Sequence, residues 1–195
     1  MKTGVVRSIN QRGFTLIEVL VSLLVISVGL LAIASLQLLS KRSNYDAAQR
    51  TTAAHLAEDL LARMRSNPVA LITYMPGALL GGSTLAAPAT TCIGAGANCS
   101  AEELADFDLW QWEQELDGAL ETQDGIASGG IVSPQACITG PGFGGNGTYT
   151  VAIAWRGLTE STNPVTDSCG EGSGLYGGND EYRRVLVVST YINAG

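Results

Sequence analysis

The sequence predicts an α+β fold in which a long N-terminal helix packs on a small antiparallel β-sheet, with one additional helix. Three observations support this prediction. Residues 14–66 contain no proline and are compatible with one continuous helix. Ser100-Ala101-Glu102-Glu103 has the spacing of a capping box, which begins a helix. Beyond Gly125 the apolar residues recur at a period of two, as in strands. After the first 40 residues, the rest of the 195-residue chain is long enough for one domain with a single core.

The first half of the long helix, residues 14–40, is predicted to be a transmembrane segment. Val19–Leu39 contains no charged residue and is about 30 Å long as a helix, enough to cross a bilayer. Glu18 precedes it, and an ionisable residue in such a segment is a functional candidate. An ordinary secretory signal cleaved at Ala32-Ile33-Ala34 is an alternative, but the helical pattern continues past Ala34. The flanking positive charges are nearly balanced, so they do not fix the orientation in the membrane.

The second half, residues 41–67, is predicted to be amphipathic and to pack on the rest of the chain. Charged residues such as Arg50 and Glu58 fall between the apolar ones. His55, the only histidine, has no cysteine near it in sequence and is expected at the surface or at an interface. The predicted core face consists of Tyr45, Ala48, Thr52, Leu56, Leu60 and Met64.

The next part of the chain is predicted to be an irregular connection followed by a helix. Residues 68–100 are rich in Pro, Gly, Ala, Ser and Thr and show no sustained period, so at most a short helical turn is expected. The helix, about residues 101–120, should be acidic outside and aromatic inside. Trp110, Trp112 and Trp155 are interpreted as core or subunit contacts. The apolar residues of this helix are Leu104, Phe107, Leu109, Trp110, Trp112, Leu116 and Leu120.

The C-terminal part is predicted to contain three or four antiparallel strands. Thr148–Trp155 and Arg183–Ile192 have the strand period, and Ile131–Ile138 is a weaker candidate because Pro134 interrupts it. Gly140–Gly145 is interpreted as a hairpin connection. Leu158–Asn179 is predicted to be a long loop of a kind that is uncommon in a small domain unless it is functional or pinned.

Four cysteines suggest disulfide bonds, for which three pairings are possible. We favour Cys92 with Cys99, which closes a short loop, and Cys137 with Cys169, which would pin the long loop to a strand. Free buried thiols or a metal site are the alternatives.

Composition argues against several functions. The net charge of −7 disfavours nucleic acid as a partner. No paired acid and base indicates a catalytic site, and no cofactor is expected. The carboxylates of the long loop lack the spacing of a calcium site, so a solvated acidic loop is predicted and no metal is expected. These loop carboxylates are Asp167, Glu171, Asp180 and Glu181.

Residues 12–19, Arg-Gly-Phe-Thr-Leu-Ile-Glu-Val, resemble the processing and assembly signal of type IV prepilins. The resemblance implies that prepilin peptidase cleaves between Gly13 and Phe14 and that Phe14 becomes N-methylated. It also implies that Glu18 docks against the amine of a subunit already in the filament. The freed amine of Phe14 would lie about one helical turn from Glu18.

Cys92 and Cys99, followed by Ser100–Leu109 and Trp112, resemble the head of PilV-type minor pilins, and this similarity extends over most of the chain. It implies a type IV pilin-like fold in four parts. These parts are a prepilin leader (1–13), a transmembrane and assembly helix (14–40), the amphipathic half of the same helix (41–67) and a periplasmic globular head (68–195).

The implied protein is a minor pilin, not an enzyme, that is incorporated into the type IV pilus or primes its assembly, in pilus biogenesis, twitching motility and adhesion. Its implied partners are prepilin peptidase, other minor pilins, the major pilin, the inner-membrane assembly platform and, before assembly, the lipid bilayer. It would cross the bacterial inner membrane once, with a cytoplasmic N-terminus and a periplasmic head, before reaching the pilus tip.

Three other functions remain open from the sequence. A minor pseudopilin of a type II secretion system begins in a very similar way. A pilus-tip adhesin or ligand-binding module would use the loop Leu158–Asn179 as its contact surface. A membrane-anchored enzyme is the third alternative, although no active-site residues indicate it.

Overall fold

The computed structural model describes residues 13–94, 96–119, 122–123, 126–127 and 129–194. The chain divides into two compact units, Met1–Ser43 and Asn44–Gly195. The predicted leader lies outside the described residues except for Gly13. The elements in chain order are α1 (Leu16–Ser66), the 3₁₀ turn η1 (Pro68–Ala70), α2 (Ala101–Leu116), β1 (Thr122–Gln123), β2 (Ile126–Ala127), β3 (Gln135–Thr139), the 3₁₀ turn η2 (Gly142–Gly144), β4 (Gly147–Arg156) and β5 (Arg183–Ile192).

The first unit contains the apolar part of α1. The helix begins at Leu16 because Thr15 caps it. The backbone N–H of Glu18 donates to the Thr15 hydroxyl oxygen at 3.4 Å and to the Thr15 carbonyl at 3.1 Å. The large apolar side chains from Phe14 to Leu39 are all exposed, by 48% at Val19 to 83% at Phe14. By length and composition, α1 is able to cross a membrane.

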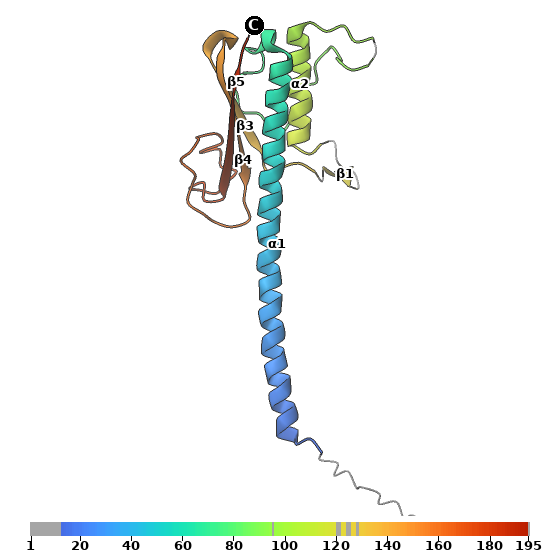
Figure 1. Ribbon diagram of the computed structural model, residues 1–195, viewed down its shortest axis with the longest axis vertical. Coiled ribbons are helices and arrows are strands. Elements are labelled where there is room, and N and C mark those ends of the chain that lie inside the picture. Colours follow the sequence, from blue (N-terminus) through green and yellow to red (C-terminus); the bar gives the residue numbers. More distant parts are fainter. Residues whose placement is uncertain (1–12, 95, 120–121, 124–125, 128, 195) are drawn as a thin grey trace, which may run out of the picture. The chain divides into compact units, whose positions relative to one another are not determined.

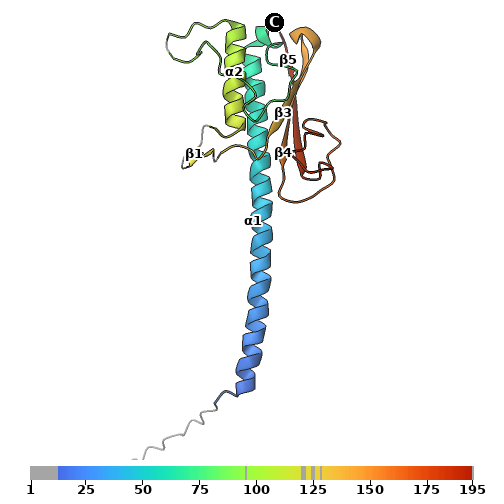
Figure 2. The ribbon, with the colours of Figure 1, turned by 180° about the vertical axis from the view of Figure 1, so that it is seen from behind.

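In the second unit, the C-terminal half of α1 lies between α2 and a three-stranded sheet (Figures 1 and 2). The sheet has the order β3-β4-β5 and is antiparallel throughout. Strands β4 and β5 pair along their whole length, from Gly147 opposite Ile192 to Arg156 opposite Arg183, without a bulge. This arrangement is the type IV pilin-like α+β fold that the sequence predicts.

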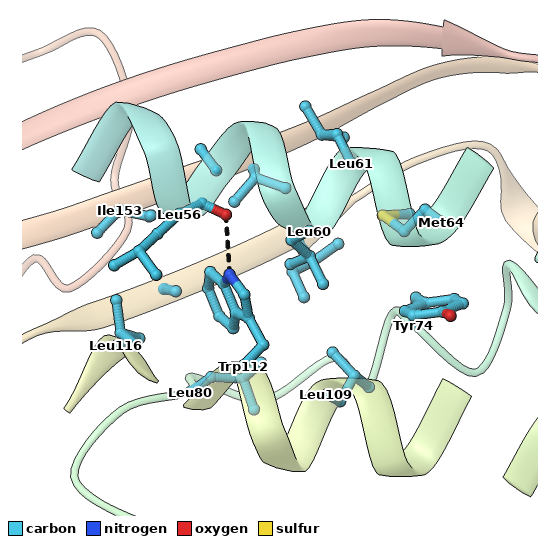
Figure 3. Close-up of a cluster of buried hydrophobic side chains, with 14 of the residues drawn as sticks. Leu56, Leu60, Leu61, Met64, Tyr74, Leu80, Leu109, Trp112, Leu116 and Ile153 are labelled. Carbon is cyan, nitrogen blue, oxygen red and sulfur yellow. Dashed lines mark hydrogen bonds between the residues drawn. The ribbon is translucent and has the colours of Figure 1, made fainter. Parts of the chain in front are cut away.

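One hydrophobic core joins the two helices and the sheet (Figure 3). Trp112 of α2 is completely buried, and its indole Nε1 donates to the Leu56 carbonyl of α1 at 2.8 Å. A buried indole needs such a partner because leaving the N–H unsatisfied is costly. The core side chains around it include Leu56, Leu60 and Met64 from α1, Leu109 and Leu116 from α2, and Ile153 from β4.

The core face of α1 differs from the prediction at its beginning. Tyr45 and Ala48 are exposed, whereas Gln49 is buried. Gln49 is tolerated inside because its Oε1 accepts the backbone N–H of Val132 at 3.1 Å. From Leu56 onward the predicted face is buried.

Helix α2 begins at the predicted capping box. Ser100 Oγ accepts the N–H of Glu103 at 3.2 Å, and Glu103 Oε2 accepts the N–H of Ser100 at 2.8 Å. The helix ends at Leu116, earlier than predicted, and Gly118 follows with a φ of +68°. Glycine reaches this left-handed conformation without steric cost, which is typical of helix ends. The predicted end at residue 120 lies outside the described residues.

Strands β4 and β5 cover the two stronger strand predictions. Strand β3 begins only at Gln135, directly after Pro134, whereas the prediction began at Ile131. Proline has no N–H for the ladder, so the strand can form only after it. Gly140–Gly145 connects β3 to β4, as predicted for a hairpin connection.

Candidate functional site

The candidate processing site lies where the chain enters α1. Gly13, Phe14 and Thr15 are not helical, and the helix begins after them. Gly13 and Phe14 are both exposed, and a Cβ placed on Gly13 would meet no atom within 4 Å. The peptide bond between Gly13 and Phe14 is therefore in irregular, accessible backbone.

Phe14 and Glu18 face the same side of the beginning of α1. Both line an open hollow of about 310 Å³, with Ser22 one turn further along the helix. The remaining lining is apolar and comes from Val19, Leu23 and Ile26. The geometry thus places the Glu18 side chain beside the residue that would become the new N-terminus.

Glu18 is the one ionisable residue between Phe14 and Ser40. No described residue provides its carboxylate with a hydrogen bond or an ion pair. The serines of the same segment differ, because Ser22, Ser27 and Ser35 each donate to the carbonyl four residues earlier, at 2.7, 2.7 and 3.0 Å. Hydroxyls bonded in this way are acceptable in lipid, whereas a carboxylate without a partner is not.

In the head, two disulfide bonds hold the irregular segments. Cys92 bonds to Cys99 across a separation of 7 residues, before α2. Cys137 of β3 bonds to Cys169 of the long loop across 32 residues. These are the two pairs that the sequence favours, and no described cysteine is free.

Arg183, at the start of β5, organises the long loop between β4 and β5. Its side chain is completely buried, and Nη1 donates to the Cys169 carbonyl at 2.7 Å. Nη2 donates to the carbonyls of Pro164 and Asp167, both at 2.7 Å, and Nε donates to Asn163 Oδ1 at 2.8 Å. The loop backbone is therefore tied to the sheet by one cation. This role of Arg183 was not predicted from the sequence, although Arg183 closely follows the loop.

The four loop carboxylates accept hydrogen bonds from other groups of the same loop. Asp167, Asp180 and Glu181 accept the backbone N–H groups of residues 169, 172 and 179 at 2.7, 2.8 and 2.9 Å. Glu171 accepts Asn163 Nδ2 at 3.1 Å. Within the described segments no group of three or more His, Cys, Asp or Glu is arranged to hold a metal ion. His55 is exposed on α1.

A second buried charge, Glu113 of α2, was also missed because α2 was predicted to keep its acidic side chains outside. Its side chain is completely buried. Oε1 accepts the N–H groups of Gly81 and Thr84 at 2.8 and 2.9 Å and the Thr84 hydroxyl, while Oε2 accepts the N–H of Leu85 at 2.7 Å. Asp117 holds the same turn through the N–H groups of residues 82 and 83.

The hydrogen bonds to Glu113 decide its ionisation. Burial alone would raise the pKa of Glu113, because the charged form loses water. The hydrogen bonds from the Thr84 side chain and from the N–H groups of Gly81, Leu85 and Thr84 outweigh this effect, so the pKa lies below its ordinary value. The carboxylate therefore works as a charged clamp that holds residues 81–85 on α2.

Comparisons with known proteins bear on both units. Residues 9–34 match the prokaryotic N-terminal methylation motif, a range that includes Gly13, Phe14 and Glu18. Residues 35–110 match the family model described as Tt1218-like, type IV pilin Tt1218. No curated protein and no solved structure shows significant similarity to the chain. Type IV pilins are structural, non-enzymatic proteins that prepilin peptidase processes and that assemble with other pilins. Together with the α+β architecture and the apolar N-terminal helix, these two adjoining matches support the assignment of the chain as a type IV pilin.

Proposed function

We propose that this protein is a minor pilin of the PilV type, which is incorporated into the type IV pilus at low copy and primes its assembly. It enters the inner membrane with a cytoplasmic N-terminus and a periplasmic head. The head motif from Cys92 to Trp112 supports the PilV type, and the disulfide bonds support an oxidising compartment such as the periplasm.

The observation that carries the proposal is the unpartnered carboxylate of Glu18 in an otherwise apolar, exposed helix. Prepilin peptidase cleaves after Gly13 and frees the amine of Phe14, which is then methylated and stays cationic. Glu18 and Phe14 line the same hollow, so the amine and the carboxylate are within about one helical turn. An incoming subunit offers its Glu18 to the amine of a subunit already in the filament. This pairing neutralises both charges where no water is present.

The exposed apolar side chains of α1 supply the driving force for the rest of assembly. Outside lipid, the side chains from Phe14 to Leu39 can avoid water only by packing against similar helices. The filament core provides such helices. Charge pairing at Glu18 then sets the axial position of each subunit, while apolar packing holds it there.

The test compares Glu18→Ala and Glu18→Gln with Ser27→Ala as the matched control. Ser27 lies in the same apolar segment but does not line the hollow of Glu18, and its hydroxyl donates to the Leu23 carbonyl at 2.7 Å. Mass spectrometry of the N-terminal peptide measures cleavage and methylation, and the sheared surface fraction measures pili. We expect all variants to be cleaved after Gly13, with loss of pili only in the two Glu18 variants. Normal piliation with stable Glu18→Ala protein would refute the docking role.

A second experiment identifies the machine to which the protein belongs. The gene is deleted and complemented with the intact chain, and surface pili and exported protein in the medium are measured together. A PilV-type role predicts loss of pili with normal export. Loss of export with normal pili would instead identify a minor pseudopilin of a type II secretion system.

A further inference from the structure

One edge of the sheet is open. Strand β5 is the last strand of the order β3-β4-β5, so it pairs with β4 on one side only. Among the described residues, none forms a backbone hydrogen bond with Val185–Tyr191 on the side away from β4. This leaves a row of N–H and C=O groups that is ready to pair with another strand.

Natural sheets protect such edges, and β5 lacks the usual protection. Val185–Ile192 contains no charged residue and no proline, and its register with β4 has no bulge. The opposite edge, β3, is protected. It is only 5 residues long, it follows Pro134, and Leu80 covers it through two hydrogen bonds with Ala136, at 3.0 and 2.8 Å. The β5 edge is therefore the longer and the less protected of the two.

A groove runs beside the open edge. It has a volume of about 280 Å³ and lies between β5 and the head half of α1. It is lined by Leu61 and by the oppositely charged Glu58 and Arg65 from α1, and by Val188, Ser189 and Thr190 from β5. The Arg65 guanidinium donates a hydrogen bond to the Thr190 hydroxyl oxygen. On the other face of β5, the side chains of Val187 and Tyr191 are exposed. A strand added to β5 would alternate its side chains between these two surfaces.

We propose that the β5 edge binds an extended segment of a different pilin subunit by strand addition. A polypeptide strand fits this edge. A strand that lies 4.7–4.9 Å from β5 would pair its own N–H and C=O groups with the unpaired backbone groups of β5. In the described part of the chain, Leu80 covers the β3 edge, so the sheet of a second copy could offer only its own β5 edge. The inference rests on the proposed function. It identifies the β5 edge as the contact through which the head selects a neighbouring subunit.

The two surfaces define the chemistry of the bound segment. Residues that point into the groove lie over Leu61 and Val188, between Glu58 and Arg65, so apolar side chains flanked by polar ones fit there. Residues on the other face lie beside Val187 and Tyr191, where β-branched or aromatic side chains pair favourably. A segment with this alternation and without proline is expected.

The test is photo-crosslinking in piliated cells, with a photoreactive amino acid at position 187 or 189 of the full chain. These positions are exposed and lie on the same face of β5. We expect both to crosslink to one segment of another pilin, at residues two apart. Position 165, which is 97% exposed in the long loop, is the control and should give no such product. Absence of a pilin product, crosslinks three or four residues apart, or crosslinks to β5 of a second copy would overturn the proposal.

A charge at the edge provides the complementary test. Val187→Lys should abolish the crosslink from position 189, because a lysine on an edge strand opposes pairing. Val165→Lys should leave the crosslink unchanged, and both proteins should be processed normally. An unchanged crosslink in Val187→Lys would also overturn the proposal.

Piliation of Glu18→Ala separates the strand-addition hypothesis from the proposed function. If that variant loses pili and no crosslink forms, only strand addition fails, whereas normal pili would refute the proposed function itself.

Discussion

Replacing Glu113 by glutamine should destabilise the head strongly, although the two side chains have the same shape. In the structure Oε1 accepts three hydrogen bonds from Gly81 and Thr84, and Oε2 accepts one from Leu85. The amide oxygen of glutamine can replace Oε1. Its NH₂ group would then replace Oε2 and face the N–H of Leu85, so two donors would meet in a buried place.

The magnitude follows from these four bonds. Losing a hydrogen bond to a charged group and leaving the Leu85 N–H buried costs about 2 kcal/mol. The three remaining bonds lose their charge assistance, which adds about 1 kcal/mol after the easier desolvation of a neutral amide is subtracted. We therefore expect the free energy of unfolding to fall by about 3 kcal/mol, a large part of the stability of a small domain.

The assay is denaturant unfolding of the full chain in detergent, followed by tryptophan fluorescence, to which Trp112 in the core contributes. Glu102→Gln is the control, because Glu102 is exposed on the same helix and should change stability by less than about 0.5 kcal/mol. If Glu113→Gln were as stable as the control, the clamp role of Glu113 would be wrong.

The same pair of proteins should show a pH dependence. The pKa of Glu113 is lower in the folded chain than in the unfolded chain, where it is about 4.3. Its stabilising contribution is therefore complete above about pH 4.3 and is lost as the pH falls through the folded pKa. The difference in unfolding free energy between wild type and Glu113→Gln should be constant near pH 7 and shrink below about pH 4.

The remaining predictions concern the long loop and the disulfide bonds. Arg183→Met should lower the free energy of unfolding by about 3–5 kcal/mol, because buried carbonyls lose their donors. Limited proteolysis should then cut within residues 158–179, and an uncut loop would contradict the anchoring role. Replacing Cys137 and Cys169 by serine should cost about 4 kcal/mol, against about 2 kcal/mol for Cys92 and Cys99, since the separations are 32 and 7 residues. Equal melting temperatures of the two double variants would refute this entropic ranking.

Local signals in the sequence predicted the elements of the fold. The capping box at Ser100 placed the beginning of α2, and the alternation of apolar residues placed β4 and β5. Pro134 was predicted to interrupt the strand, and β3 begins directly after it. Each of these features depends on a few neighbouring residues, so the sequence carries the information directly.

The buried polar residues could not be predicted in the same way. Gln49, Glu113 and Arg183 have partners 83, 28–32 and 14–20 residues away, and only the folded chain brings these groups together. A hydrophobic pattern assigns polar residues to the surface, because burial without a partner is unfavourable. For the long loop, the sequence did indicate that the loop must be held in place, and the disulfide bond of Cys169 was predicted to hold it. Arg183 also holds the loop, but no sequence pattern distinguishes it from other arginines.

The two proposed assembly contacts answer the same physical need in different ways. Glu18 has a full charge that lipid cannot solvate, so its partner must bring a compensating cation, and the contact fixes one axial position. The β5 edge has many small dipoles that water solvates before assembly, so a strand that binds there gains little per hydrogen bond. Most of the favourable binding free energy must therefore come from side-chain contacts with Leu61 and Val188 in the groove and with the exposed Tyr191. Glu18 is therefore suited to a contact that every subunit shares, whereas the β5 groove is suited to choosing between neighbours.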